Sequence, residues 1–153
     1  MARSLVLDAN ILVRAVLGTR VHRLLMTHAG EIRFLTVDEA FEDAQTYVPQ
    51  VLAKHGGGGE ELEAAAAKLE QLRVFVHTVP IENLERFEST ARRRLQGRDE
   101  EDWPYLALAL LLECPVWTED TDFFGTGVAV WTTDRIALFF EDDGGKTVGP
   151  DPG

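Results

Sequence analysis

The segment that decides the fold is Ser4-Leu5-Val6-Leu7, which is followed directly by Asp8-Ala9-Asn10. A short, unbroken apolar run is typical of a strand that is buried on both faces of a parallel sheet. An acid at the end of such a strand lies at the edge where open α/β sheets bind their ligands. This stretch therefore predicts both the fold class and the edge of the sheet that carries the function.

Later apolar runs are similar to the first, and we predict further strands at about 32–35, 74–79, 115–118 and 128–131. Between the strands we predict helices at 11–17, 21–28, 38–52, 60–72, 81–95, 103–112 and 135–140. Alternating strands and helices are the pattern of a parallel sheet that is covered on both faces. We therefore expect one α/β domain over residues 1–141 and a flexible, Gly/Pro-rich tail over 142–153.

Local signals refine the helix ends. Thr36 and Glu39 form the spacing of a capping box, which predicts a helix start at that point. The run Gly56–Gly59 lacks the Lys-Ser/Thr of a phosphate-binding loop, so it predicts a flexible turn between two helices. Pro104 has no amide hydrogen, so its helix must begin just before it, near 101–102.

The composition describes an ordinary globular chain. Its 153 residues can bury one core, and 45% of them are hydrophobic. Cys114 is the only cysteine, so no internal disulfide can form, and its apolar neighbours predict a buried, inert thiol. We recognise neither a secretory leader nor an apolar run near the ~20 residues that a membrane-spanning helix needs. We therefore expect a cytoplasmic protein that does not interact with membranes.

The net charge of −11 argues against general nucleic-acid binding, but the charges are unevenly distributed. Residues 97–143 hold 12 acids and only two arginines, whereas five arginines lie within the 13 residues 86–98. An acidic basin with a basic flank suits a metal ion and a polyanion together. Arg92, Arg93, Arg94 and Arg98 are our candidates for backbone phosphate contacts. The alternative is that these arginines lie on solvated helix faces.

The acids at the ends of apolar segments are the candidate site. Asp8 follows the first strand, Asp120 follows the fourth, and Asp102 opens a helix; Glu42 lies within the helix predicted over 38–52. Carboxylates gathered at one edge repel one another unless a cation lies among them. An all-oxygen ligand set selects Mg²⁺ or Mn²⁺, which can generate hydroxide and polarise a phosphoryl oxygen. The sequence therefore predicts hydrolysis of a phosphodiester without a protein nucleophile.

Each acid also has a simpler explanation. Asp8 and Asp102 could be helix N-caps, Asp120 a turn residue and Glu42 a solvated helix residue. Asp99 lies one helical turn before Asp102 and could replace or assist it. Glu42 has competitors in its neighbours Asp38, Glu39 and Asp43. The hypothesis depends on the joint placement of the acids rather than on any one of them.

Three ordered motifs resemble the PIN-domain nuclease family, which includes the ribonuclease toxins of VapBC-type toxin–antitoxin pairs. They are Leu5-Val6-Leu7-Asp8-Ala9-Asn10, then Asp102-Trp103-Pro104-Tyr105 with its apolar continuation, and Val116-Trp117-Thr118-Glu119-Asp120-Thr121-Asp122-Phe123. The resemblance extends from residue 5 to residue 123. It implies a three-layer α/β/α fold around a mostly parallel five-stranded sheet, and a Mg²⁺- or Mn²⁺-dependent endoribonuclease activity.

Matched residue by residue, the resemblance assigns roles to seven side chains. Asp8, Glu42, Asp102 and Asp120 match the acidic quartet that binds the metal and catalyses the reaction. Asn10 and Thr118 match positions that orient the ligands, and Asp122 matches one that holds the metal or its bound water. Independently, an amide or hydroxyl beside a ligating carboxylate fixes its orientation, as outer ligands do at metal sites.

The resemblance also implies partners. We expect an RNA substrate, and an antitoxin-like protein inhibitor and a homodimer are consistent with the family. Phe139 and Phe140 either contribute to such a dimer interface or close the core. An alternative function is a non-catalytic interaction module whose acidic pocket binds an arginine of a basic partner. A phosphotransfer domain is less consistent, because a phosphatase of that kind needs a second aspartate where Asn10 stands.

Overall fold

The computed structural model of the protein describes residues 3–141, so the predicted tail over 142–153 lies outside the described residues. Its centre is a five-stranded sheet with the order β3-β2-β1-β4-β5, and every pairing is parallel. The strands are β1 (Arg3–Leu7), β2 (Ile32–Val37), β3 (Val76–Val79), β4 (Val116–Trp117) and β5 (Val130–Trp131). The predicted parallel five-stranded sheet is confirmed.

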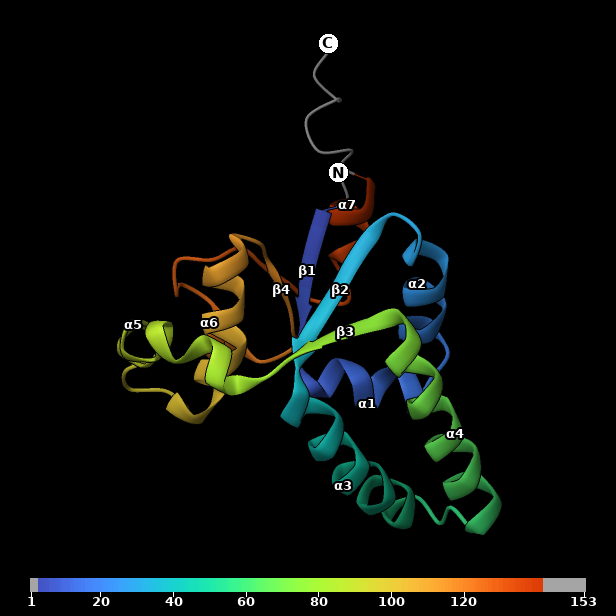
Figure 1. The fold of residues 1–153 in the computed structure, drawn as a ribbon. Helices are drawn as coiled ribbons and strands as arrows, with labels where there is room; N and C mark the ends of the chain where they lie inside the picture. The colour runs from blue at the N-terminus through green and yellow to red at the C-terminus, as the bar shows by residue number, and fades with distance from the viewer. Residues whose placement is uncertain (1–2, 142–153) are drawn as a thin grey trace.

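The helices cover both faces of this sheet, which makes three layers (Figure 1). α5 and α6 lie on one side and α1 and α2 on the other, while α3 and α4 project beyond the carboxyl ends of the central strands. The α-helices are α1 (Ala9–Leu17), α2 (Arg20–His28), α3 (Asp38–Lys54), α4 (Gly59–Phe75), α5 (Glu88–Arg94), α6 (Trp103–Leu112) and α7 (Ile136–Glu141). Short 3₁₀ turns occupy η1 (Ile81–Phe87), η2 (Glu100–Asp102) and η3 (Thr121–Phe123).

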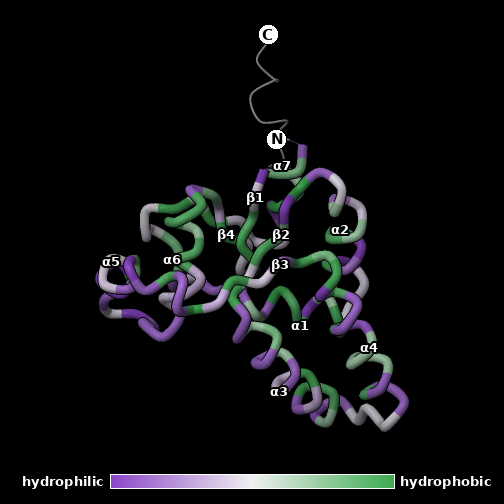
Figure 2. The backbone as a smooth tube through the Cα atoms, viewed as in Figure 1, coloured by the Kyte–Doolittle hydropathy of each residue, from purple (hydrophilic) through white to green (hydrophobic). Residues whose placement is uncertain are grey.

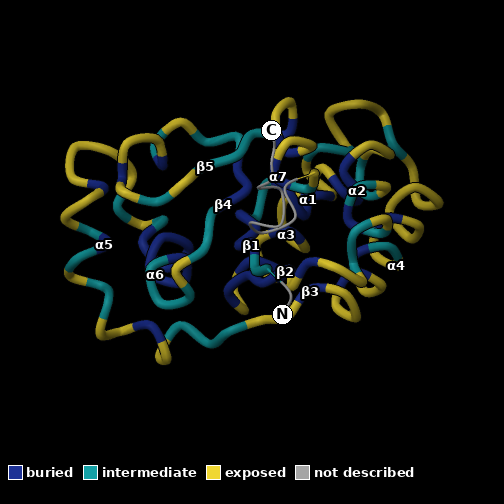
Figure 3. The backbone as a smooth tube through the Cα atoms, turned by 90° about the horizontal axis from the view of Figure 1, so that it is seen from above, coloured by how far each residue is buried: buried dark blue, intermediate teal, exposed yellow. Residues whose placement is uncertain are grey.

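Apolar residues decide this layering. β1 is hydrophobic and buried from Leu5 to Leu7, and α6 is buried over its first seven residues, Trp103 to Ala109. Figure 2 shows β1 and the later part of α6 as hydrophobic, while α5 is mostly hydrophilic. Seen from above, buried residues concentrate around β1, β4 and α6, and the outer parts of α4 and α5 are exposed (Figure 3). The core therefore holds β1 and β4 rigidly side by side.

Several local predictions were wrong or incomplete. Thr36 is not a helix cap, because it lies in β2 and its hydroxyl donates to the Leu7 carbonyl at 2.7 Å. The helix predicted over 81–95 is split into the 3₁₀ turn η1 and the short helix α5. β3 begins at Val76 rather than residue 74, because α4 continues through Phe75. Long-range strand pairing overrides the local capping signal at Thr36.

Other local predictions hold. Residues between α3 and α4 form the predicted turn, where the Gly58 amide donates to Glu61 at 3.0 Å. Pro104 lies in the first turn of α6, where a missing amide hydrogen leaves no bond unmade. Burial raises the pKa of the half-buried Cys114 thiol to about 11, so the thiol is protonated and inert near neutral pH.

The last helix closes the amino-terminal edge of the sheet. Arg3 donates to the carbonyl of Phe139 at 2.6 Å, and the ring of Phe140 stacks on His28 at a centroid distance of 4.0 Å. Phe140 also contacts Phe34 and Trp117 edge to face. These rings close the core, and the homodimer stays a prediction. Across residues 3–141, no helix has the length and apolar character required to cross a bilayer.

Candidate metal centre

The candidate site lies where the strand order reverses. β1 pairs with β2 on one side and with β4 on the other, so the chain leaves β1 and β4 at a topological switch point. Asp8 follows β1, and its amide donates to the Trp117 carbonyl of β4 at 3.2 Å. Ligands of open α/β sheets bind in the crevice at such a point. The fold thus brings Asp8 next to the segment that leads to Asp120.

Asp8 is the most tightly held acid of this edge. Its side chain is buried, with an exposed fraction of 6%, and its Oδ2 accepts a hydrogen bond from the Thr118 hydroxyl at 2.6 Å. The side-chain Nδ2 of Asn10 donates to the same oxygen at 3.1 Å. Asp8 occupies the N-cap position of α1, but its side chain makes no capping hydrogen bond. The carboxylate is therefore oriented by Thr118 and Asn10 and does not cap α1.

Asp120 is linked to the same hydroxyl. Its backbone amide donates to Thr118 Oγ1 at 2.9 Å, so one buried hydroxyl connects the backbone of Asp120 with the carboxylate of Asp8. The Asp120 side chain caps η3 by accepting from the Asp122 amide at 2.9 Å, as the turn interpretation expected. Only Oδ1 takes part in that bond, which leaves the second carboxylate oxygen for other partners.

Neighbouring acids affect the pKa of Asp102. It ends η2 and stands at the N-cap position of α6, again without a capping hydrogen bond from its side chain. Burial, followed by the negative charges of Asp8, Asp99 and Asp120, raises the pKa of Asp102 to about 7. Burial is also the main cause that raises the pKa of Asp8, and the charge of Asp120 adds to it. The negative charges of Asp8 and Asp120, at the strand ends, and of Asp102, at the start of α6, therefore lie in one partly desolvated region.

The other predicted acids lie at the margins of the region around Asp8, Asp102 and Asp120. Asp122 directs Oδ2 to the Asp99 amide at 3.2 Å, and Asp99 caps η2 by accepting from Glu101 at 3.1 Å. Glu42, on α3, is exposed. Its neighbour Asp43 lines a hollow of about 470 Å³ together with Asn10 and residues of α1 and α3. Asp43 lines the same hollow as Asn10, and burial raises the pKa of Glu39, so both acids compete with Glu42.

Tyr105 is a residue of this region that sequence reasoning did not single out. Its ring is buried at 6% exposure, and burial raises the pKa of its hydroxyl, with further contributions from Asp8, Asp43, Asp102 and Glu39. The phenol therefore stays protonated among acids of α1, α3 and α6. Its spacing of three residues after Asp102, one helical turn, was the available signal.

The donor atoms of these residues are of the kind that a hard divalent cation prefers. All candidate donors are oxygens, and the acids disfavour one another's ionised forms, which a cation would reverse. Asn10 Oδ1 is buried without a hydrogen-bond partner in the described chain, so a donor such as an ion-bound water is missing there. Among residues 3–141, no three His, Cys, Asp or Glu side chains already form a ready cluster for an ion. Binding would thus require carboxylate rotation.

The arginines predicted to contact RNA have different surroundings. Arg98 donates through Nη1 to the carbonyls of Asp122 and Phe124, and Arg94 donates to the Thr126 carbonyl at 3.0 Å. Arg92 pairs with Glu88 at 2.8 Å. Arg93 is exposed, and among residues 3–141 no acid lies within salt-bridge distance of it. The cluster is therefore not a uniform basic surface.

Comparisons with known proteins agree with this architecture. A family model described as "PIN domain" matches residues 6–141. The structure of VapBC2 from Rickettsia felis, bound to a promoter DNA fragment, is similar with a TM-score of 0.64 and 13% identity, over 84% of this chain and 98% of that one. FitAcB from Neisseria gonorrhoeae is similar with a TM-score of 0.63 and 19% identity, over 84% and 97% of the two chains.

A toxin–antitoxin complex from Klebsiella pneumoniae is also similar, with a TM-score of 0.53 and 18% identity, over 84% of this chain and 96% of that one. At these identities the structural likeness establishes the three-layer fold. A comparison of the sequence with curated proteins found no match. The family model covers most of the sequence, from β1 to the end of α7, and includes every candidate site residue. The chain therefore belongs to the PIN-domain family.

Proposed function

We propose that the chain is a metal-dependent endoribonuclease that hydrolyses phosphodiester bonds of RNA. The observation that supports this most directly is the buried carboxylate of Asp8, oriented by Thr118 and Asn10 and accompanied by Asp102 and Asp120 at the switch point. PIN domains are generally nucleases, and this site has the carboxylates that such chemistry requires. No nucleophilic side chain is needed, because the attacking group is water.

Each side chain has a defined task in this proposal. Asp8, Asp102 and Asp120 would hold Mg²⁺ or Mn²⁺, which when bound polarises a phosphoryl oxygen and acidifies a water molecule. A fourth acid comes from α3: Glu42 by family resemblance, or Asp43, which lines the same hollow as Asn10. Asp122 would hold the ion or its water from the margin. Asn10 Oδ1, which has no hydrogen-bond partner among residues 3–141, would accept a hydrogen bond from such a water.

Thr118 has a positioning role. Its hydroxyl donates to Asp8 and accepts from the Asp120 amide, so both of its hydrogen-bonding functions are used within the site. It thereby fixes the distance between the ends of β1 and β4. Partly desolvated carboxylates bind a cation more strongly than exposed ones because their interaction is screened less.

The decisive experiment combines Mn²⁺ titration calorimetry with RNA cleavage by the purified chain. Wild type should bind Mn²⁺ and cleave RNA only when Mg²⁺ or Mn²⁺ is present. Asp8→Asn keeps an acceptor for Thr118 but removes the charge, so we expect cleavage to fall by ~1,000-fold or more with the fold intact. Asn10→Ala should reduce turnover less, by ~10-fold, because it only orients a ligand.

A matched control is Asp134→Asn, since Asp134 is an acid with 87% side-chain exposure whose ion pair is with Arg20. This variant should bind Mn²⁺ and cleave RNA as the wild type does. Full activity in Asp8→Asn would refute the assignment of Asp8. Metal binding without cleavage of any RNA would instead favour the non-catalytic interaction module.

The comparisons also support a role as the toxin of a toxin–antitoxin pair, because one of the similar structures is described as a toxin–antitoxin complex. We propose an antitoxin-like protein as inhibitor, whose arginine would pair with the carboxylates of the site. A short reading frame beside the gene should encode a protein that binds this chain and inhibits cleavage. Cleavage that is unaffected by this protein would contradict the toxin role.

A further inference from the structure

Arg98 ties the acidic site to the turn after α5. It follows Gly97, whose φ of +84° bends the chain so that the arginine faces the loop after β4. Its Nη1 donates to the Asp122 carbonyl at 2.6 Å and to the Phe124 carbonyl. The next residue adds a second tie, because the Asp99 amide donates to Asp122 Oδ2 at 3.2 Å. Three hydrogen bonds thus join this turn to η3.

These bonds continue without interruption to Asp8. The Asp122 amide donates to the Asp120 carboxylate at 2.9 Å, and the Asp120 amide donates to the Thr118 hydroxyl at 2.9 Å. The Thr118 hydroxyl donates to the Asp8 carboxylate at 2.6 Å. The guanidinium group of Arg98 is therefore connected through three residues, Asp122, Asp120 and Thr118, to Asp8, the most buried acid of the site.

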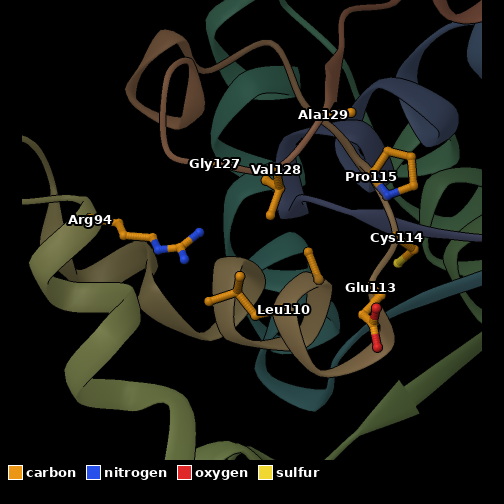
Figure 4. A pocket seen from close by; sticks show the side chains of 9 residues that line it. Arg94, Leu110, Glu113, Cys114, Pro115, Gly127, Val128 and Ala129 are labelled. Atoms are coloured by element: carbon orange, nitrogen blue, oxygen red, sulfur yellow. The ribbon is translucent and has the colours of Figure 1, made fainter.

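Arg94 supports the far end of the same loop. Its Nη1 donates to the Thr126 carbonyl at 3.0 Å, while the Thr126 hydroxyl turns back to the Phe123 carbonyl at 2.6 Å. Gly127 has φ of +96°, a backbone conformation that L side chains rarely adopt, and the Arg94 guanidinium lies against it. Figure 4 shows Arg94 extending from α5 towards Gly127 and Val128, across a cavity of about 390 Å³. The loop is thus shaped to receive this arginine.

We propose that Arg98, supported by Arg94, is a positioning residue that sets the orientation of Asp120 in the metal site. This inference rests on the proposed nuclease function and assigns to Arg98 a role other than binding RNA. A guanidinium group donates in fixed directions, so it can hold two carbonyls of one turn in a defined geometry. Its positive charge also lies next to a loop that carries several acids, and so reduces their repulsion.

A direct phosphate contact is the competing explanation, because Arg98 is exposed. The two explanations differ in what they do to the enzyme. A phosphate contact contributes mainly to binding, and its loss weakens RNA affinity and lowers the salt dependence. A positioning residue contributes through Asp120, so its loss reduces Mn²⁺ affinity and the turnover number. Of these effects, only the loss of Mn²⁺ affinity can be measured without any RNA.

The experiment compares Arg98→Ala with Arg23→Ala, an equal loss of charge at an exposed position on α2. For Arg98→Ala we expect Mn²⁺ affinity and kcat each to fall by ~10-fold, typical for loss of an outer partner at a metal site. KM and the salt dependence of KM should change less than ~2-fold, because no phosphate contact is lost. Arg23→Ala should change neither the metal affinity nor kcat.

Arg98→Lys sharpens the test. A lysine keeps the charge but lacks the planar fork, so it should restore less than half of the lost kcat if Arg98 orients the loop. Nearly complete restoration by lysine, together with an elevated KM in Arg98→Ala, would assign Arg98 to RNA and overturn the inference. Unchanged Mn²⁺ affinity in Arg98→Ala would overturn it as well.

A further measurement is independent of the proposed function. Amide hydrogen exchange of Asp120 and Asp122 should accelerate by ~10-fold or more in Arg98→Ala relative to Arg23→Ala, because the loop opens more often. If the wild type neither binds Mn²⁺ nor cleaves RNA, the nuclease proposal fails while this exchange result still decides whether Arg98 holds the loop. Equal exchange in the two variants would show that it does not.

Discussion

The acids at the strand ends and the acids of α3 are held in opposite ways. Asp8 is buried and receives hydrogen bonds from Thr118 and Asn10, while Asp120 is fixed through its amide and its carboxylate. Glu42 and Asp43 are exposed on a helix that projects beyond the sheet (Figure 1). A strand end in a parallel sheet is positioned by its neighbours on both sides, whereas a helix can rotate or tilt about its contacts.

This difference has a cost in free energy. Asp8 and Asp120 are held by hydrogen bonds, so binding an ion would require rotation of carboxylates but little ordering of the backbone that carries them. Burial and mutual repulsion raise the pKa of Asp8 and of Asp102, which means that their ionised forms destabilise the metal-free fold. The ionised acids at this edge of the sheet therefore lower the stability of the metal-free fold, and a bound cation would offset this loss.

The largest expected effect that tests this comparison is that of Asp102→Asn. Losing this carboxylate should reduce cleavage by ~100-fold or more, since it removes a proposed metal ligand. The same change should stabilise the metal-free protein. The folded-state pKa of Asp102 is about 7 and its ordinary value is 3.8, so the folded state retains a proton between these values that the unfolded state releases.

Consequently, stability that is present below about pH 4 is lost as the pH rises towards 7. Asp102→Asn should unfold like the wild type near pH 4 and be more stable by ~1–2 kcal/mol at pH 8, a value reduced for solvent screening. Denaturant titrations at both pH values measure this, with Asp134→Asn as control. A variant that is less stable than the wild type at pH 8 would contradict the repulsion on which the argument depends.

The positions of the strand-end acids were easier to predict from the sequence than the facing of the helical acids, for the same physical reason. β1 ends at Leu7, where its apolar run ends, so Asp8 could be placed at the strand end from the pattern. On α3, four acids lie within six residues, 38–43, and the sequence alone does not fix which side of the helix faces the site. Hydrogen bonds across the sheet, such as Thr36 to Leu7, were equally invisible to local reasoning.

The role of Arg98 shows a second limit. Its position in an arginine-rich segment predicted a phosphate contact, as composition does for any exposed arginine. The structure instead gives it backbone carbonyls that lie 24 and 26 residues further along the chain. Contacts of that range depend on where the turn after α5 meets the loop after β4, and no periodicity or motif in the sequence encodes that meeting.

A smaller effect is expected from the α3 acids, and it would sharpen the comparison. Glu42→Gln and Asp43→Asn each remove one charge from the projecting helix. We expect Asp43→Asn to weaken Mn²⁺ binding by ~3- to 10-fold and Glu42→Gln by less, because Asp43 lines the same hollow as Asn10 and, unlike Glu42, contributes to the raised pKa of Tyr105. Calorimetric titration measures both. A larger loss for Glu42→Gln would show that α3 rotates when the ion binds and would support the family-based assignment.

The smallest effect should come from Arg93→Ala, which separates the two kinds of arginine in the α5 region. Arg93 is exposed to solvent, and among residues 3–141 no acid pairs with it. If RNA passes over α5, this change should raise KM by ~2- to 5-fold and reduce the slope of log KM against log salt by up to ~1, with kcat unchanged. Steady-state cleavage at several salt concentrations measures both quantities. A fall in kcat instead would mean that Arg93 too acts on the loop, so that the basic segment as a whole positions the acids and the RNA must be held elsewhere.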